Sequence, residues 1–416
     1  MSIWSFAMAG PPAHSDAKEG RDQRHPYARS TITLLIIPAI IIAASFTLYL
    51  QTANPLFRFS DGGELAAASY TLGIAHPTGY PAFLMLQKTW SFLVPIGNPC
   101  FRANLMSALC ASIALALIYL FTLRIAGLIA GLVAAGLFAM SETFWLQATQ
   151  STVYTLNLML GALLILVAFR ALHHPATLQM IALFFLVLGF GLGNHVTLLL
   201  VPIALLVSHP FSFGRILGRK TAILTALIFL MVGLSIYLYM PLRAQQDPPI
   251  NWGDTSISER MWEHISQQDY KFKQASRTTG EYFSATGTFF ASIANELGIV
   301  GAILALIGLV HGIIKRDTSS LLFFVVLALG TLMVALLYGE RDELEPIYCL
   351  PAYLAAAALA GLGANLILKL CSGVRRASGQ LAPRKAFISL CAIVLLVLPP
   401  MVLGISNYHR CDSSQN

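Results

Sequence analysis

The chain has 416 residues, of which 56% are hydrophobic and 11% are charged, and its mean hydropathy is +0.71. A water-soluble domain of this length could not cover its surface with so few polar residues, so the composition predicts an all-α, polytopic membrane protein. The formal net charge of +7 does not indicate a nucleic-acid partner, because the Lys and Arg residues lie in short clusters between apolar runs and form no basic face.

Residues 1–30 are polar, and no apolar stretch with a cleavage site precedes the first apolar run, so we expect a cytoplasmic N-terminal tail. Residues 31–405 then form one transmembrane domain, and residues 406–416 form a C-terminal tail. Apolar runs in this domain predict about eleven membrane-spanning helices, several of them short or tilted. The runs cover residues 31–50, 103–123, 125–140, 153–170, 178–193, 195–208, 221–241, 289–314, 320–338, 347–370 and 386–405.

The first outer loop, residues 51–102, carries more polar groups than a connection between two membrane helices needs. Glu64 to Ile74 has the composition of a short amphipathic helix at the membrane interface. Tyr80 to Pro95 predicts a second interfacial helix, because Lys88 would be costly in the middle of a span. We therefore expect two interfacial helices in this loop.

Asp61 and Glu64 are three residues apart, so they share one face if the segment is helical. Asp61 is either an N-cap, whose carboxylate accepts backbone N–H bonds, or a general base that takes a proton from an acceptor hydroxyl. His76 begins the turn sequence His-Pro-Thr-Gly-Tyr-Pro81 and is structural by default. Its closeness in sequence also makes it, with Glu64, a candidate supporter of Asp61.

The run from residue 178 to residue 208 is too long for one crossing and is interrupted by Gly191-Leu-Gly-Asn-His195. Splitting it there predicts a tight hairpin with Asn194 and His195 at its tip. The split also places most basic residues in cytoplasmic loops, as the positive-inside rule requires. The polar segments of the chain then emerge together on the non-cytoplasmic face.

A large outer loop, residues 242–288, follows the span that ends near Pro241. Arg243 either extends its charged end to the interface or binds a lipid phosphate, because a guanidinium matches phosphate oxygens. Asn251 and Trp252 suit the recognition of a sugar, although tryptophan is also common in interfacial belts without any ligand.

Other polar residues are candidates for the lining of the same site. Arg341, in an acidic run at residues 339–346, is either paired locally or a second cation for a phosphate. Tyr80, Tyr154, Asn194 and His195 are candidates for contact with the substrate. The sequence contains no nucleotide-binding motif and no metal-ligand cluster, so we expect a lipid-linked sugar donor and no metal site.

Five ordered motifs resemble a known membrane family, and together they are much more specific than any one alone. They are Asp61-Gly-Gly-Glu-Leu with Leu72-Gly-Ile-Ala-His-Pro-Thr-Gly-Tyr-Pro81, Gly97-Asn-Pro with Arg102-Ala-Asn-Leu-Met, Val153-Tyr-Thr-Leu-Asn157, Gly193-Asn-His195, and Pro241-Leu-Arg-Ala with Asp247-Pro-Pro-Ile-Asn-Trp-Gly-Asp254. The family is domain of unknown function 2723, whose animal members are protein O-mannosyltransferases grouped as glycosyltransferase family 117. The resemblance extends from about residue 31 to about residue 370.

The resemblance implies a GT-C-like fold and a membrane glycosyltransferase. Such an enzyme transfers a mannose-like sugar from a polyprenyl-phosphate donor to an acceptor hydroxyl of a protein or glycan, generally with inversion. It implies Asp61 as the catalytic residue and Arg243 as a ligand of the donor phosphate, with no obligatory cofactor and a divalent metal optional. We expect a bacterial inner membrane with the site facing the periplasm. The alternatives are a transporter or flippase for polyprenyl-linked glycans and a non-catalytic scaffold.

Overall fold

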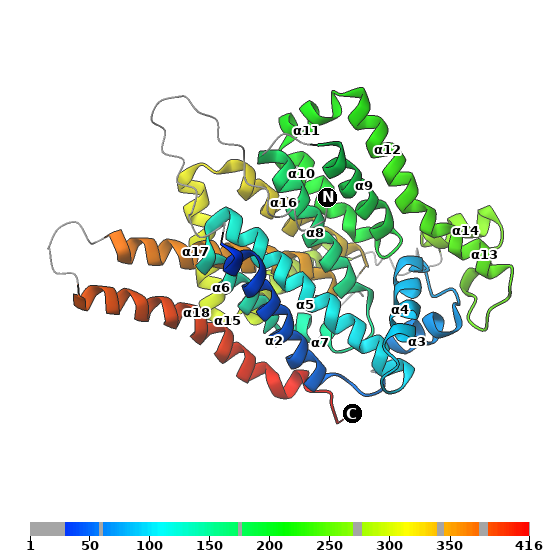
Figure 1. Cartoon of the computed structure of the whole chain (residues 1–416), viewed down its shortest axis with the longest axis horizontal. Helices are drawn as coiled ribbons and strands as arrows, with labels where there is room; N and C mark the ends of the chain where they lie inside the picture. Colours follow the sequence, from blue (N-terminus) through cyan, green and yellow to red (C-terminus); the bar gives the residue numbers. More distant parts are fainter. Residues whose placement is uncertain are drawn as a thin grey trace.

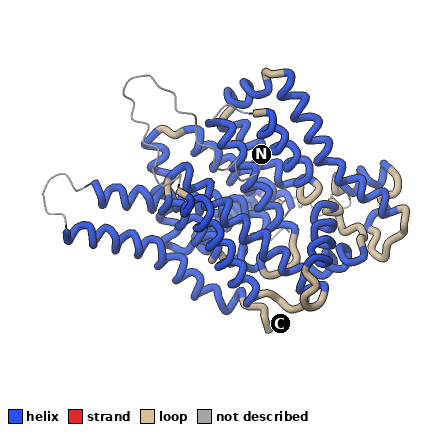
Figure 2. The backbone as a smooth tube through the Cα atoms, in the orientation of Figure 1, coloured by secondary structure: helices blue, strands red, loops and turns tan. Residues whose placement is uncertain are grey.

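A computed structural model describes residues 30–57, 61–173, 177–268, 277–338, 345–373 and 382–415. The described chain is almost entirely helical and contains no β-strand, apart from one isolated bridge between Ile74 and Asn251 (Figures 1 and 2). The prediction of an all-α protein is confirmed.

The helices alternate between long crossings and short connecting pieces. In chain order they are η2 (Ile32–Ile36), α2 (Ile37–Thr52), α3 (Gly62–Thr71), α4 (Pro81–Leu93), α5 (Pro99–Ala126), α6 (Leu128–Ala139), α7 (Glu142–Ala148), α8 (Val153–His173), α9 (Leu178–Leu192), η3 (Val196–Leu199), α10 (Leu200–Ser208), α11 (Pro210–Leu217), α12 (Lys220–Leu234), η4 (Ser235–Leu238), α13 (Tyr239–Ala244), η5 (Trp252–Asp254), α14 (Ser258–Ile265), α15 (Thr279–Lys315), α16 (Thr318–Tyr338), η7 (Pro346–Cys349), α17 (Leu350–Gly373) and α18 (Ala382–Cys411).

Each of the eleven predicted spans contains a helix. Within the described residues, seven helices are long and apolar enough to cross a membrane, or nine if each of two bent pairs counts as one span. These pairs are α6 with α7, bent by 71°, and η3–α10 with α11, bent by 94°. The remaining two predicted spans correspond to α9, which has 15 residues, and to α18. The chain is therefore a multi-pass membrane protein.

The predicted hairpin near residue 193 is present. Helix α9 ends at Leu192 and η3 begins at Val196, so the chain reverses within Gly193, Asn194 and His195. Helix α12 packs along α9, where both backbones carry glycine: a Cβ at Gly189 would lie 2.4 Å from the Leu230 carbonyl oxygen. The hairpin tip lies against the start of α4, where the Ala82 N–H donates to the Gly193 carbonyl oxygen at 3.0 Å.

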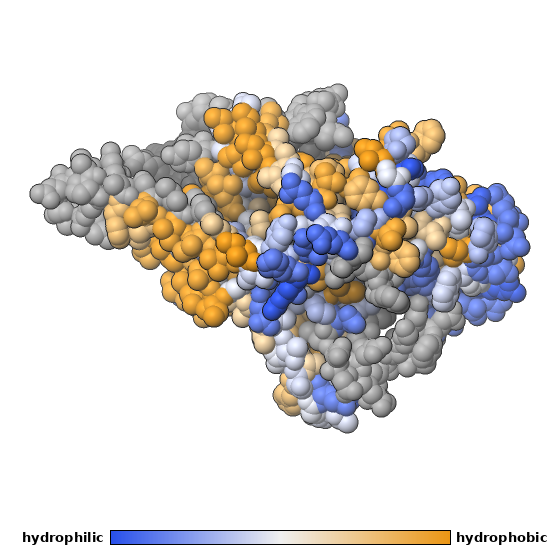
Figure 3. Space-filling model, turned by 90° about the horizontal axis from the view of Figure 1, so that it is seen from below, coloured by the Kyte–Doolittle hydropathy of each residue, from blue (hydrophilic) through white to orange (hydrophobic). Residues whose placement is uncertain are grey.

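Both predicted short helices of the first outer loop are present as α3 and α4. They lie at the same end of the molecule as α13 and α14 (Figure 1). Hydrophilic residues gather toward this end, whereas much of the remaining visible surface is hydrophobic (Figure 3). Two segments far apart in the sequence, residues 62–93 and 239–265, therefore meet here.

Helix α7 is held at its N-terminus by a buried carboxylate from another helix. The Glu296 Oε2 atom accepts the Thr143 backbone N–H at 3.1 Å, and Oε1 accepts the Thr143 hydroxyl proton. Helix α18 continues to Cys411, and Asn407 donates to the Met140 carbonyl oxygen at 2.9 Å. The residues expected to form a tail after position 405 therefore begin inside a packed helix.

The closest helix contact joins α15 and α17 through a reciprocal pair of glycines. A Cβ at Gly308 would lie 2.0 Å from the Leu359 carbonyl oxygen, and a Cβ at Gly363 would lie 2.0 Å from that of Leu304. Small residues allow such backbone approach in membrane proteins, where packing replaces the hydrophobic drive between helices.

Gly308→Ala should therefore destabilise the protein, because the added methyl group meets rigid backbone; overpacking of this kind costs about 1–3 kcal/mol. The matched control is Gly287→Ala in the same helix, where no atom lies within 4 Å of the new Cβ and a gain of about 0.5–1 kcal/mol is expected. Thermal unfolding in detergent measures both. Equal midpoints for the two variants would show that this contact is not tight.

Candidate active site

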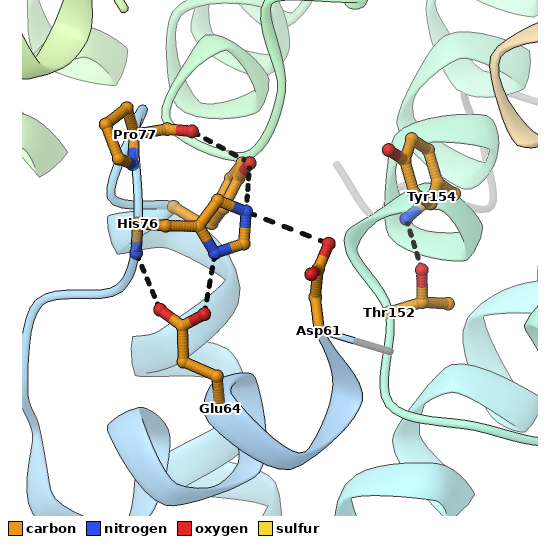
Figure 4. A network of polar contacts seen from close by, with 7 residues as sticks. Asp61, Glu64, His76, Pro77, Thr152 and Tyr154 are labelled. Carbon is orange, nitrogen blue, oxygen red and sulfur yellow. Dashed lines mark hydrogen bonds and ion pairs between the residues drawn. The ribbon is translucent and has the colours of Figure 1, made fainter. Parts of the chain in front are cut away.

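Asp61 stands directly before α3, with its carboxylate exposed. Its backbone occupies the N-cap position, but the side chain makes no capping hydrogen bond, and 66% of it is solvent-accessible. Of the two alternatives for Asp61, the capping role therefore has no support in the geometry. The carboxylate is instead turned toward His76 (Figure 4).

Glu64, one helical turn further, fixes the turn that contains His76. Its Oε1 atom accepts the His76 backbone N–H at 2.7 Å, and its Oε2 atom lies 2.9 Å from His76 Nδ1. Burial raises the pKa of Glu64, but the hydrogen bonds and the charge of His76 outweigh burial and leave this pKa below the ordinary value of 4.5. Because an ionised carboxylate only accepts hydrogen bonds, Nδ1 carries a proton.

The other ring nitrogen of His76 faces Asp61 and Tyr80. Its Nε2 atom lies 3.8 Å from Asp61 Oδ2 and 3.0 Å from the Tyr80 hydroxyl oxygen, which itself donates to the Pro77 carbonyl oxygen at 3.1 Å. The spacing of three residues thus places both carboxylates around one imidazole, as Figure 4 shows. We call these four residues the His76 cluster: Asp61, Glu64, His76 and Tyr80.

An aromatic row continues from the His76 cluster toward α8. The rings of Tyr80 and His195 are parallel with centroids 6.2 Å apart, and Tyr154 lies 5.3 Å from His195. The ring of Tyr348 meets Tyr154 edge-on at 6.1 Å. Residues that are more than 250 positions apart in the sequence therefore form one wall beside Asp61.

His195 is neutral in this wall. Burial, with a smaller contribution from the nearby His76, lowers its pKa to about 4. Its Nδ1 atom accepts from the Thr197 backbone N–H at 3.3 Å and lies 2.7 Å from the Thr197 hydroxyl, which accepts from Asn157 at 3.0 Å. This chain of bonds places the ring proton of His195 on Nε2.

Other predicted site residues are Asn194, Asn251, Trp252 and Arg341. Asn194 is fully buried and donates to the Val153 carbonyl oxygen at 3.0 Å, which secures the hairpin tip. Asn251 and Trp252 pair through their backbones with Ile74, and the Trp252 side chain is half exposed. Arg341 lies outside the described residues.

Arg243 lies at the far end of α3 from Asp61. Its Nε atom donates to the Leu72 carbonyl oxygen at 2.7 Å and one Nη donates to that of Thr71 at 3.2 Å, while the other Nη bonds the Gln246 side chain. At least three of the five N–H donors of the guanidinium are therefore engaged by the protein. The ten residues of α3 correspond to about 15 Å of helix between the end near Arg243 and the end near Asp61.

The sequence interpretation missed Asn104, whose buried amide joins two loops near the site. Its Nδ2 atom donates to the carbonyl oxygens of Asn54 and Leu56, at 2.8 and 2.9 Å, and its Oδ1 atom accepts the Ser151 N–H at 2.6 Å. Gln87 on α4 donates to the Ser151 hydroxyl at 2.8 Å. A polar residue within an apolar run is the signal that points to such a role.

An apolar cavity of about 620 Å³ lies beside α4, between α9 and the end of α12. Leu186, Val187 and Phe190 form one wall, and Tyr239, Leu242 and Arg243 form another. Its predominantly apolar lining and its size are typical of a site for an apolar chain.

No three His, Cys, Asp or Glu side chains come together in a way that could hold a metal ion in the part of the chain that the structure describes. The carboxylate of Glu64 and the ring of His76 are hydrogen-bonded to each other.

Comparison with known proteins points to one family. Residues 61–212 match the family model described as the N-terminal domain of protein O-mannosyl-transferase TMEM260. Protein O-mannosyl-transferase TMEM260 of Mus musculus is 30% identical over 238 residues, which are 55% of this chain and 33% of that protein. The Dictyostelium discoideum relative of the same description is 25% identical, over 93% of this chain and 52% of that protein. The chain thus spans one third to about half of the length of these relatives.

Solved structures show the same fold at low sequence identity. ArnT from Cupriavidus metallidurans, bound to undecaprenyl phosphate, matches with a TM-score of 0.58 and 12% identity over 92% of this chain and 76% of that one. The Archaeoglobus fulgidus oligosaccharyltransferase in its apo form matches with a TM-score of 0.56 and 13% identity, over 92% of this chain and 57% of that one. The resemblance indicated by the sequence motifs is therefore confirmed: residues 61–212 are related to the N-terminal domain of the TMEM260 protein O-mannosyl-transferases, and the chain has a GT-C-like membrane fold.

Proposed function

We propose that this protein is a membrane glycosyltransferase that transfers a mannose-like sugar from a polyprenyl-phosphate donor to an acceptor hydroxyl, such as that of a Ser or Thr residue in a protein. The observation that carries the proposal is the exposed Asp61 carboxylate, held 3.8 Å from His76 Nε2 and free of any capping bond. The TMEM260 relatives and the ArnT structure with undecaprenyl phosphate support this substrate class.

In this reaction Asp61 takes the proton of the acceptor hydroxyl as its oxygen forms a bond to the anomeric carbon. The bond between that carbon and the phosphate oxygen breaks, and the phosphate leaves with the electron pair. A phosphate is a good leaving group and needs only positive charge around it, which Arg341 is proposed to supply. The proton on Asp61 then passes to solvent, because this carboxylate is exposed.

His76 and Glu64 have a supporting role in this proposal. Glu64 holds the Nδ1–H of His76, and the Tyr80 hydroxyl proton is directed to Pro77. In that arrangement His76 Nε2 faces both the Tyr80 hydroxyl oxygen, at 3.0 Å, and the Asp61 carboxylate, at 3.8 Å. Glu64 therefore holds the imidazole in place beside the proposed base.

We further propose that the site faces the non-cytoplasmic side, the periplasm of a bacterial inner membrane. The distribution of basic residues supports this orientation, because the loops on the opposite side carry most of them. The apolar cavity beside α4 is the proposed place for part of the polyprenyl chain, since its lining is apolar and it extends from Met85 to Arg243.

Asp61→Asn should lower the transfer rate by about 10²- to 10⁴-fold, the usual contribution of a general base, without weakening donor binding. The measurement is transfer from a synthetic polyprenyl-phosphate sugar to an acceptor by purified protein. The control is Asp317→Asn, another exposed aspartate, which bonds only the start of α16 and should retain activity. Undiminished transfer by Asp61→Asn would exclude Asp61 as the base.

Glu64→Gln should remove a pH-dependent part of the stability. The pKa of Glu64 is lowered in the fold, so the stabilisation by its ionised form is complete above about pH 4.5 and is lost as pH falls below that value. The difference in unfolding midpoint between wild type and Glu64→Gln should therefore shrink as the pH drops below 4.5. Thermal unfolding in detergent at a series of pH values measures this difference. A difference that stays constant would show that the Glu64–His76 contact is unimportant.

A further inference from the structure

The segment between α3 and the His76 turn is held by donors from a distant part of the chain. Every backbone carbonyl from Thr71 to Ala75 accepts a hydrogen bond from a residue between positions 239 and 264. The donors are Arg243 to Thr71 and Leu72, the Tyr239 hydroxyl to Gly73 at 2.8 Å, the Trp252 backbone N–H to Ile74 at 3.2 Å, and His264 Nε2 to Ala75 at 3.0 Å.

Further contacts on both sides make the arrangement continuous. The Ile74 N–H donates back to the Ile250 carbonyl oxygen at 2.8 Å. A Cβ at Gly73 would lie 2.5 Å from that same oxygen, and a Cβ at Gly79 would lie 2.9 Å from the end of the Met240 side chain. The two segments are therefore in contact from the end of α3 to the turn that precedes α4.

Few other groups could replace the donors of these hydrogen bonds. Residues 71–75 leave a helix, so their carbonyls lack helical partners, and buried carbonyls without donors are costly. Ile74 and Ala75 are fully buried, where water does not reach them. The donors from residues 239–264 therefore determine the path of the chain into His76.

We propose that Tyr239, Arg243, Trp252 and His264 form an outer clamp that positions the His76 cluster, and that Arg243 acts through the backbone of α3 and not as a direct ligand of the reacting groups. This inference deepens the proposed function and rests on it for the catalytic consequence. The guanidinium of Arg243 is engaged at the C-terminal end of α3, where a cation also stabilises the helix dipole.

The position of His76 Nε2 relative to Asp61 follows from the clamp. His76 is bonded to α3 through Glu64 on one side, and the clamp fixes the preceding residues on the other. When a clamp bond is lost, the ring moves relative to Asp61, and the surroundings of the reacting carboxylate change. A positioning role therefore predicts a change in pH dependence as well as in rate.

Tyr239→Phe is the most selective test, because it removes one hydroxyl and keeps the ring. Its matched control is Tyr237→Phe, since the Tyr237 hydroxyl also donates to a backbone carbonyl, that of Leu192 on α9, at 2.7 Å. Both tyrosines are partly buried. The two variants lose equivalent bonds and differ only in which segment is released.

The first measurement is hydrogen–deuterium exchange of the unliganded protein in detergent. Tyr239→Phe should raise exchange at the amides of Ile74, His76 and Gly79 about fivefold, as expected for the loss of one hydrogen bond, and Tyr237→Phe should not. Equal exchange in the two variants at these amides would overturn the clamp. This result does not depend on any enzymatic activity.

The second measurement is the pH profile of sugar transfer for Tyr239→Phe and Arg243→Lys. A positioning role is supported if Tyr239→Phe and Arg243→Lys lower kcat and also shift the acidic limb of the pH profile. Tyr237→Phe should change neither quantity. If Arg243→Lys raises KM for the donor alone and leaves kcat and the pH profile unchanged, Arg243 is a phosphate ligand and its positioning role is wrong. If wild type transfers sugar from no polyprenyl-phosphate donor, the proposed function fails and the exchange result alone decides whether the clamp exists.

Discussion

Backbone carbonyl groups beyond the end of a helix need hydrogen-bond donors, and the end of this protein that carries α3 and α4 is arranged around that need. The five carbonyls between Thr71 and Ala75 obtain their donors from a segment about 170 residues further along the chain. Satisfying them brings the first outer loop and the segment 239–264 together. The position of His76, and through it the surroundings of Asp61, depends on this pairing.

The helical bundle supplies a rigid base for this outer end. Reciprocal glycines bring α15 against α17, and another pair brings α9 against α12, so these helices have little freedom to slide. Asn104 and Glu296 then secure the irregular segments: Asn104 joins the start of the first outer loop to Ser151, and Glu296 holds the start of α7. Both of these buried side chains connect backbone segments, and both have hydrogen-bond partners on their two terminal atoms.

Local patterns in the sequence were enough to predict the helices, the reversal near Gly193 and the sharing of one face by Asp61 and Glu64. These features depend on hydropathy, on glycine and on the helical repeat, which act over a few residues. The role of Arg243 could not be obtained in this way. An arginine at the exit of a span has the same local sequence whether it meets a phosphate or a carbonyl oxygen, and only the packing of α13 on α3 distinguishes the two. The contacts of Tyr239 and His264 depend on the same long-range packing, and the assignments of Asp61, Arg243 and Arg341 to chemical roles stay predictions.

The apolar cavity and the outer clamp share Tyr239 and Arg243. A molecule that enters the cavity and moves either side chain must alter the bonds to Gly73, Leu72 or Thr71, and so the setting of His76. Free-energy coupling between two sites is reciprocal. Occupancy of the cavity and the position of His76 relative to Asp61 are then linked quantities, so a variant that loosens the outer clamp should also change the affinity of the cavity for an apolar chain.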